Sequence, residues 1–199
     1  MPGVSLEARA LTGPATTFRA AADERSAGAW RLLRRPLLLA LFLGCAVSIQ
    51  ASGRLSVRLI VDGIVSFAFV PVFEVLSLAV VYKRGPRRVP FAQAVDLFFI
   101  ANMPWLLWLL TFSAVRSLQT PVQATALPDW WVLTLLLSVV PMACWSAYMD
   151  LQFFRTVMPR QEGSAARDLI LQRTISWTCI LGWYVGHELW EYVAVWINV

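Results

Sequence analysis

The only histidine of the chain lies in a segment whose side chains could carry protons or bind cations, Gly186-His187-Glu188-Leu189-Trp190-Glu191. On a helix His187 and Glu191 share one face, because they are four residues apart, and Glu188 lies beside them. Histidine and glutamate inside membranes often form proton relays. The segment also resembles the first half of a zinc-protease helix, but Glu191 replaces the second histidine. We therefore expect a polar packing cluster or a proton- or cation-handling site, and we predict no metal or other cofactor.

Glu74 has no partner of opposite charge nearby on its own segment. It lies near the middle of an apolar run, three residues after Pro71, and no basic residue falls within one helical turn of it. Because burial disfavours a charged carboxyl, we expect Glu74 to be protonated, hydrogen-bonded to another helix or in contact with water. A structural bond between helices and a functional role are both compatible with this position.

Two aspartates are expected to form ion pairs near the membrane surfaces. Arg58 precedes Asp62 by four residues, so both share a helix face near the outer end of an apolar run. Asp96 lies close to the cytoplasmic end of the next run, within reach of Arg87 or Arg88. We assign both aspartates a structural role first and keep them as secondary candidates for a site.

Prolines interrupt three of the apolar runs, at Pro71, Pro104 and Pro141. Each proline removes a backbone hydrogen bond, and in lipid the freed groups need another partner. Such a position is either a packing kink or a broken helix at a binding site, and the second interpretation requires polar groups nearby. Asn102, just before Pro104, is a candidate to bridge helices or to satisfy the freed groups.

The elements that position these residues are hydrophobic helices. Of 199 residues, 58% are hydrophobic and 15% are charged, against roughly 45–50% and about 25% in soluble domains. The net charge of +5 comes from residues between apolar runs, which indicates a lipid bilayer as the partner and not a nucleic acid. The fold class is therefore an all-α, polytopic integral membrane bundle.

Five apolar runs are long enough, or nearly long enough, to span a bilayer. The first is short and would need flanking residues or local thinning of the bilayer. Residues 1–29 are predicted to form a flexible cytoplasmic tail and residues 30–36 a short helix at the membrane surface. The transmembrane domain is residues 30–199, with spans at about 36–51, 59–82, 91–115, 130–149 and 170–199.

The basic residues predict the orientation of these spans. Arginine and lysine alternate between rich and poor segments, with fourteen on one side and three on the other. Cytoplasmic loops carry the positive excess, so the N-terminus is expected in the cytoplasm and the C-terminus on the opposite side.

Three stretches are similar to a known family. They are Arg34-Arg35-Pro36, the basic connection from Lys83 to Ala94, and Phe99-Ile100-Ala101-Asn102-Met103-Pro104. They resemble the bacterial branch of the YIP (Ypt-interacting protein) domain family. The resemblance implies five spans, a bacterial plasma membrane and a non-enzymatic role with partners in or on the membrane.

Two functions are expected from the sequence. The first is a non-enzymatic multi-pass membrane protein that works through helix–helix or protein–protein contacts, with other membrane proteins or as a homo-oligomer. It predicts that Glu74, His187 and Glu191 are locked into direct bonds between helices, without an open cavity. The alternative is a proton- or cation-coupled transporter or channel subunit that uses His187 and the intramembrane carboxylates, in which the polar residues converge on a pocket.

Overall fold

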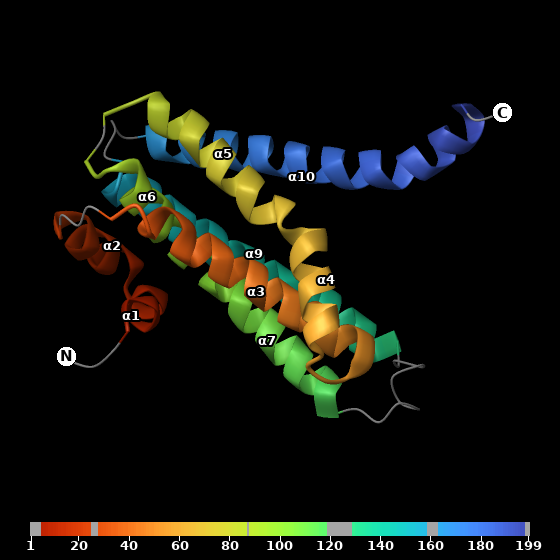
Figure 1. The fold of residues 1–199 in the computed structure, drawn as a ribbon. Helices are drawn as coiled ribbons and strands as arrows, with labels where there is room; N and C mark the ends of the chain where they lie inside the picture. The colour runs from red at the N-terminus through yellow and green to blue at the C-terminus, as the bar shows by residue number, and fades with distance from the viewer. Residues whose placement is uncertain (1–4, 25–27, 87, 119–128, 159–162, 198–199) are drawn as a thin grey trace.

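The computed structural model describes residues 5–24, 28–86, 88–118, 129–158 and 163–197, and these residues form helices without any strand. Figure 1 shows their order along the chain. The elements are α1 (Leu6–Thr12), α2 (Pro14–Asp23), α3 (Arg31–Ser52), α4 (Val57–Phe67), α5 (Phe69–Lys83), α6 (Phe91–Phe98), the 3₁₀ helix η1 (Phe99–Asn102), α7 (Met103–Leu118), α9 (Asp129–Thr156) and α10 (Ser164–Ile197).

Four helical stretches among the described residues are long and apolar enough to cross a membrane. They are Arg31–Ser52, Val57–Lys83, Phe91–Val115 and Leu133–Thr156. The all-α class is thereby confirmed, and the four stretches overlap the first four predicted spans, although the fourth continues to Thr156 and not to residue 149. The predicted fifth span falls on α10, a helix of 34 residues that is not among these four, so a total of five spans stays a prediction.

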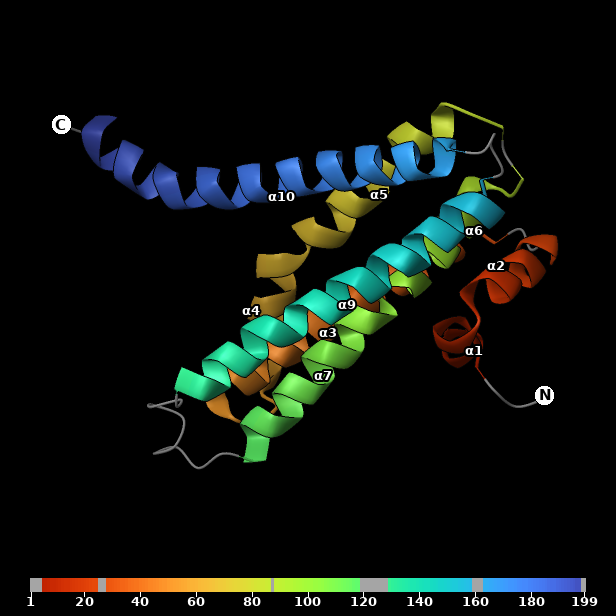
Figure 2. The same cartoon turned by 180° about the vertical axis from the view of Figure 1, so that it is seen from behind.

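The helices form a bundle from which α10 diverges. In Figures 1 and 2, α3, α7 and α9 run side by side, whereas α10 extends well beyond the other helices. α10 packs on α5 and α9. The contact between α5 and α10 extends along α10 as far as Trp183, whose ring centroid lies 6.2 Å from that of Phe73 on α5.

The first span is longer than the predicted residues 36–51. α3 begins at Arg31 and contains Pro36 in its interior, so its 22 residues reach about 33 Å, enough for a bilayer core. The separate surface helix predicted at residues 30–36 is therefore wrong, because its basic residues belong to the first turns of α3. α3 ends where Gly53 adopts a left-handed conformation with φ of 68°, which favours glycine.

α3 and α4 are in backbone contact at two glycines. A Cβ atom placed on Gly44 would lie 2.5 Å from the carbonyl oxygen of Ile60, and one on Gly63 would lie 2.9 Å from Gly44 Cα. Small residues permit such close approach between membrane helices. The pair therefore fixes the distance between α3 and α4.

The N-terminal segment is folded against the bundle, contrary to the flexible tail predicted for residues 1–29. α1 and α2 are helical. Phe18 of α2 is fully buried, and its ring centroid lies 6.0 Å from that of Phe153 on α9. The side-chain amide of Gln93 donates to the carbonyl of Ala21 at 2.8 Å and to that of Glu24 at 3.0 Å. The prediction failed because this burial depends on side chains of α6 and α9, which the local sequence does not reveal.

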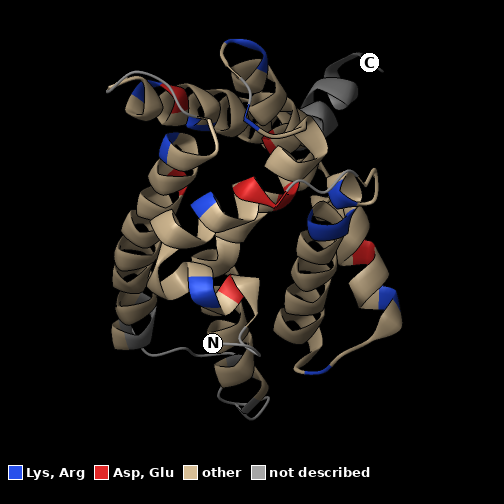
Figure 3. Cartoon of the chain, turned by 90° about the vertical axis from the view of Figure 1, so that its left-hand side faces the viewer, with Lys and Arg blue, Asp and Glu red and all other residues tan. Residues whose placement is uncertain are grey.

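Large apolar side chains cover much of the surface, and the mainly apolar interior also holds charged groups. Exposed positions on α4 and α9 carry large apolar side chains such as Val65 and Leu136, whereas Asp96 and Asp150 are buried. Figure 3 shows long helical stretches without any charged residue. A surface of this kind suits lipid and not water, which supports a membrane protein.

Candidate functional site

Four polar side chains from four elements meet inside the bundle. Arg173 of α10 donates from Nε to Asp150 of α9 at 3.0 Å, and a shorter contact joins its Nη2 to the same carboxyl oxygen. Its Nη1 lies 3.3 Å from Oε1 of Glu74 on α5. The other oxygen of Glu74 accepts from Nδ2 of Asn102 at 2.8 Å. We call these four residues the charge network.

Most of the charge network is buried, and only Arg173 is partly exposed, with 22% of its side chain accessible. Asp150 is fully buried, Glu74 is 7% exposed and Asn102 is 4% exposed. Ions in such an environment are tolerated only with close partners. Asp150 Oδ1 is buried and has no hydrogen-bond partner among the described residues. With both carboxyls ionised the network carries a net charge of −1, so one proton or one monovalent cation would neutralise it.

Two prolines place Glu74 and Asn102 beside irregular turns within a span. α4 and α5 are separated at Ala68, three residues before Pro71, where the ring of proline would clash with a regular helix, but Ala68 keeps a right-handed helical backbone. The 3₁₀ turn η1 precedes Pro104, ends at Asn102 and leads directly into α7. By contrast, α9 continues as a regular α-helix through Pro141. The positions near Pro71 and Pro104 are thus kinks within continuous helical stretches, with polar groups beside them.

The contact between α5 and α10 extends the polar region. Nε2 of Gln172 donates to the Ser77 hydroxyl at 3.0 Å, and that hydroxyl donates to the Glu74 carbonyl at 2.9 Å. Asp168 and Ser176, one turn before and after Gln172, are also buried. Residues four apart share a helix face, so α10 turns a polar stripe towards the bundle.

A cavity of about 230 Å³ opens beside the charge network. Glu74, Asn102 and Arg173 form its polar end. Most of the remaining wall is apolar and includes three indole rings, those of Trp105, Trp108 and Trp177. Such a combination of apolar walls and a few convergent polar groups is typical of a ligand pocket.

Two further cavities adjoin α7. One, of about 210 Å³, shares Leu39 and Asn102 with the first cavity and is bounded by Glu7 and Arg35. The other, of about 300 Å³, lies between α7 and α9 and has no charged residue in its wall. Trp108 contacts both this cavity and that of the charge network, and its Nε1 donates to the Ser138 hydroxyl at 2.8 Å.

Asp96 is the centre of a second ionic cluster, but not with the predicted partners. Both of its carboxyl oxygens accept from Arg34, at 3.0 and 3.1 Å, and it also forms an ion pair with Arg35. Arg35 in turn binds Glu7 of α1 at 2.6 Å. The predicted partner Arg88 instead pairs with Asp23, whereas the other, Arg87, lies outside the described residues. This cluster ties α1, α3 and α6 together.

Glu7 lies outside the membrane spans, and the neighbouring Arg35 affects its pKa. Burial by itself would raise the pKa of Glu7, but the hydrogen bond and the positive charge of Arg35 outweigh it, so that the pKa lies below its ordinary range. The carboxylate form is therefore the one that holds α1 against α3.

The remaining predicted residues do not join the charge network. Asp62 pairs with Arg58 at 3.9 Å at the exposed surface of α4, which confirms the predicted ion pair. His187 is exposed on α10 and does not line the cavity beside Glu74. The expectation that Glu74 and His187 are locked between helices without an open cavity is therefore wrong, because Glu74 lines a cavity and His187 is exposed. The expectation that His187 and Glu74 converge on one pocket is also wrong. Glu188 and Glu191 lie on the same helix, but their side chains are outside the described part of the chain. Among the described residues no three His, Cys, Asp or Glu side chains could hold a metal ion.

Asp150 and Arg173 were not recognised as site residues in the sequence. Asp150 directly follows the predicted fourth span, and Arg173 lies near the start of the predicted fifth span. A usable signal was the spacing of Asp168, Gln172 and Ser176, which places polar side chains on one face of an otherwise apolar helix. That stripe could have indicated that the helix begins before Ile170 and faces polar neighbours.

Comparisons with protein-family models, with curated proteins and with solved structures find no match for this chain. The similarity to the YIP domain family therefore stays a prediction.

Proposed function

We propose that the chain is a non-enzymatic multi-pass protein of a bacterial plasma membrane that acts through contacts with other membrane proteins or further copies of itself. One observation carries this proposal. Buried polar and charged groups are bonded to one another across helices, such as Glu74 to Asn102 and Arg173, whereas many exposed positions on α4 and α9, such as Val65 and Leu136, carry large apolar side chains. The interior thus fixes the helices, and the outer faces are left to meet lipid or another protein. The YIP resemblance implies the same kind of role.

Photocrosslinking in native membranes tests this function. A photoreactive amino acid at Val61 or Leu136, both exposed on outer faces, is expected to form discrete protein adducts in the membrane. The same group at fully buried Leu78 is the matched control and should give only crosslinks within the chain. Adducts with lipid alone from every outer position would contradict a contact function.

The alternative function, proton- or cation-coupled transport, also has support in one observation. The charge network, with its net negative charge, lies directly beside a cavity. Ionisable groups inside a membrane frequently mark ion pathways. In this case Glu74→Gln should abolish proton or cation flux in liposomes, and Asp62→Asn, at an exposed ion pair, should not. Unchanged flux in Glu74→Gln would exclude this function.

A further inference from the structure

The cavity beside the charge network has two kinds of wall, and each selects a different part of a ligand. Trp105, Trp108 and Trp177 supply aromatic rings, of which the first two pack edge to face with centroids 6.2 Å apart. The other kind of wall is polar and consists of Glu74, Asn102 and Arg173. Aromatic faces attract cations, most strongly where water is excluded.

The distribution of charge in the network decides the sign of the ligand. Arg173 makes two contacts with Asp150 but only one, of 3.3 Å, with Glu74. The second oxygen of the Glu74 carboxyl accepts a hydrogen bond from the neutral amide of Asn102. The single positive charge is therefore shared by two carboxylates, and Glu74 is the one of them that lines the cavity. Arg173 also lines the cavity, so a ligand there meets both charges, and the surplus of one negative charge belongs to the network as a whole when both carboxyls are ionised.

We propose that this cavity binds a compact hydrophobic monocation of the quaternary-ammonium class. Its cationic head would lie between the Glu74 carboxylate and the indole rings, and its apolar part along Leu43, Val70 and Ile180. The cavity volume of about 230 Å³ is below the roughly 300–1,000 Å³ of pockets for drug-sized ligands, so the ligand is small. The inference rests on the transport alternative and names its substrate class, but binding itself requires no flux.

Equilibrium binding to the purified full chain in lipid nanodiscs tests the proposal. The probe is benzyltrimethylammonium, and the control is its uncharged carbon analogue neopentylbenzene, which has the same shape. We expect benzyltrimethylammonium to bind at least about tenfold more tightly, which corresponds to about 1.4 kcal/mol. Equal affinity for the two compounds, or no saturable binding of the cation, would overturn the proposal.

Variants separate the site from unspecific partition into lipid. Glu74→Gln keeps the shape of the side chain and should weaken cation binding by about tenfold or more, whereas Asp62→Asn, an exposed carboxylate on α4, should leave it unchanged. If Glu74→Gln does not fold, Val70→Phe decides, because it keeps all four residues of the charge network, fills the cavity from its apolar wall and should abolish binding. If either folded variant, Glu74→Gln or Val70→Phe, binds the cation as tightly as the unaltered chain, the proposed site is wrong. Binding without flux in liposomes would retain the site and exclude transport.

Discussion

At the scale of single residues, Arg173 is the side chain that joins both carboxyl groups of the charge network. It contacts Glu74 on α5 and Asp150 on α9 from its own position on α10. Its replacement would leave two carboxylates in a region of low dielectric without a counter-ion. The cost of an unpaired buried charge exceeds the net gain from the pair itself, so the sign of the effect is clear.

Arg173→Met is therefore expected to lower stability by about 3–5 kcal/mol, measured as loss of helical signal on heating in detergent. The triple variant Arg173→Met, Glu74→Gln, Asp150→Asn removes the stranded charges and should recover most of the loss. If the single variant melts like the unaltered chain, the network does not hold the helices together.

The ion pair of Glu7 with Arg35, which joins α1 to α3, is expected to depend on pH. Because the pKa of Glu7 is lowered in the folded chain, its stabilising effect is complete above the ordinary Glu pKa of about 4.3 and is lost as the pH falls through the lowered folded value. A spin label on α1 at Thr12 should become more mobile in this acidic range. In Glu7→Gln the label should be more mobile already at neutral pH, with a weaker acid response. Identical pH profiles for both proteins would contradict the role of Glu7.

At the scale of elements, the contact between α3 and α4 depends on two glycines. Gly44→Ala would bring a methyl group against the Ile60 carbonyl at 2.5 Å, so the two helices must separate. We expect a loss of about 1–3 kcal/mol, seen as a lower melting temperature. Gly182→Ala on α10 is the matched control, because nothing lies within 4 Å of the added carbon. A melting temperature equal to that of this control would show that the contact is not tight.

The same scale shows which parts of the fold the sequence can predict. Helices such as α5 and α7 follow from the length of apolar runs, and the kinks near Pro71 and Pro104 follow from the chemistry of proline. Glu74 was recognised because it is isolated among apolar residues. Arg173 was not, because an arginine at the edge of an apolar run looks the same whether it faces water or pairs with another helix. Its role depends on the approach of α10 to α5, which only tertiary packing determines.

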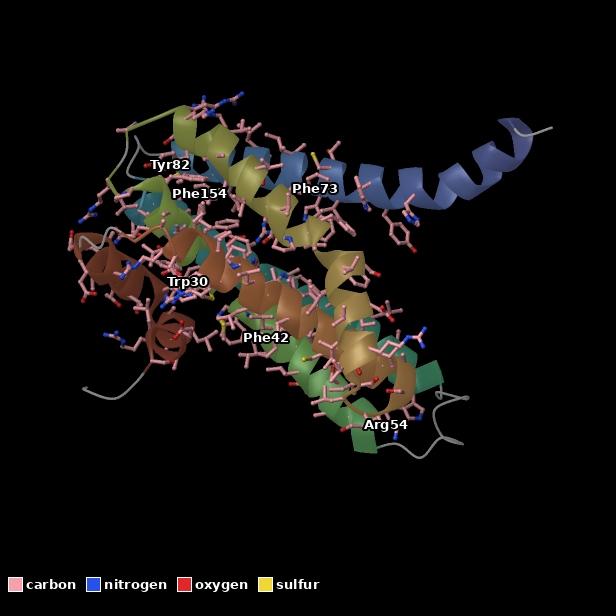
Figure 4. All side chains as sticks on the ribbon, in the orientation of Figure 1. Trp30, Phe42, Arg54, Phe73, Tyr82 and Phe154 are labelled. Carbon is pink, nitrogen blue, oxygen red and sulfur yellow. The ribbon has the colours of Figure 1, made fainter. Side chains whose placement is uncertain are left out.

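At the scale of the whole molecule, the described parts of two connections, α3 to α4 and α5 to α6, lie at opposite ends of the bundle. Figure 4 shows Arg54, in the turn between α3 and α4, at the end opposite to Tyr82, near the end of α5. α1, α2 and the arginine-rich turn between α5 and α6 lie at the second end (Figure 1). This separation supports the proposed topology, in which the arginine-rich end faces the cytoplasm.

Cysteine labelling tests that topology. In a background with Cys45, Cys144 and Cys179 replaced, Arg54→Cys should react with a membrane-impermeant maleimide in intact spheroplasts. Arg84→Cys, which is also exposed, should react only after the membrane is opened. The reverse pattern would invert the proposed orientation.

The divergence of α10 has a mechanical consequence. The charge network holds this helix at Arg173, and Trp183 still packs on Phe69 and Phe73 of α5. Beyond Trp183, 14 residues lead to the end of the helix at Ile197, a distance of about 21 Å at 1.5 Å per residue. A tilt of about 10° at Trp183 would displace the far end by about 4 Å. A small change of angle between α5 and α10 therefore produces its largest displacement at the end of α10.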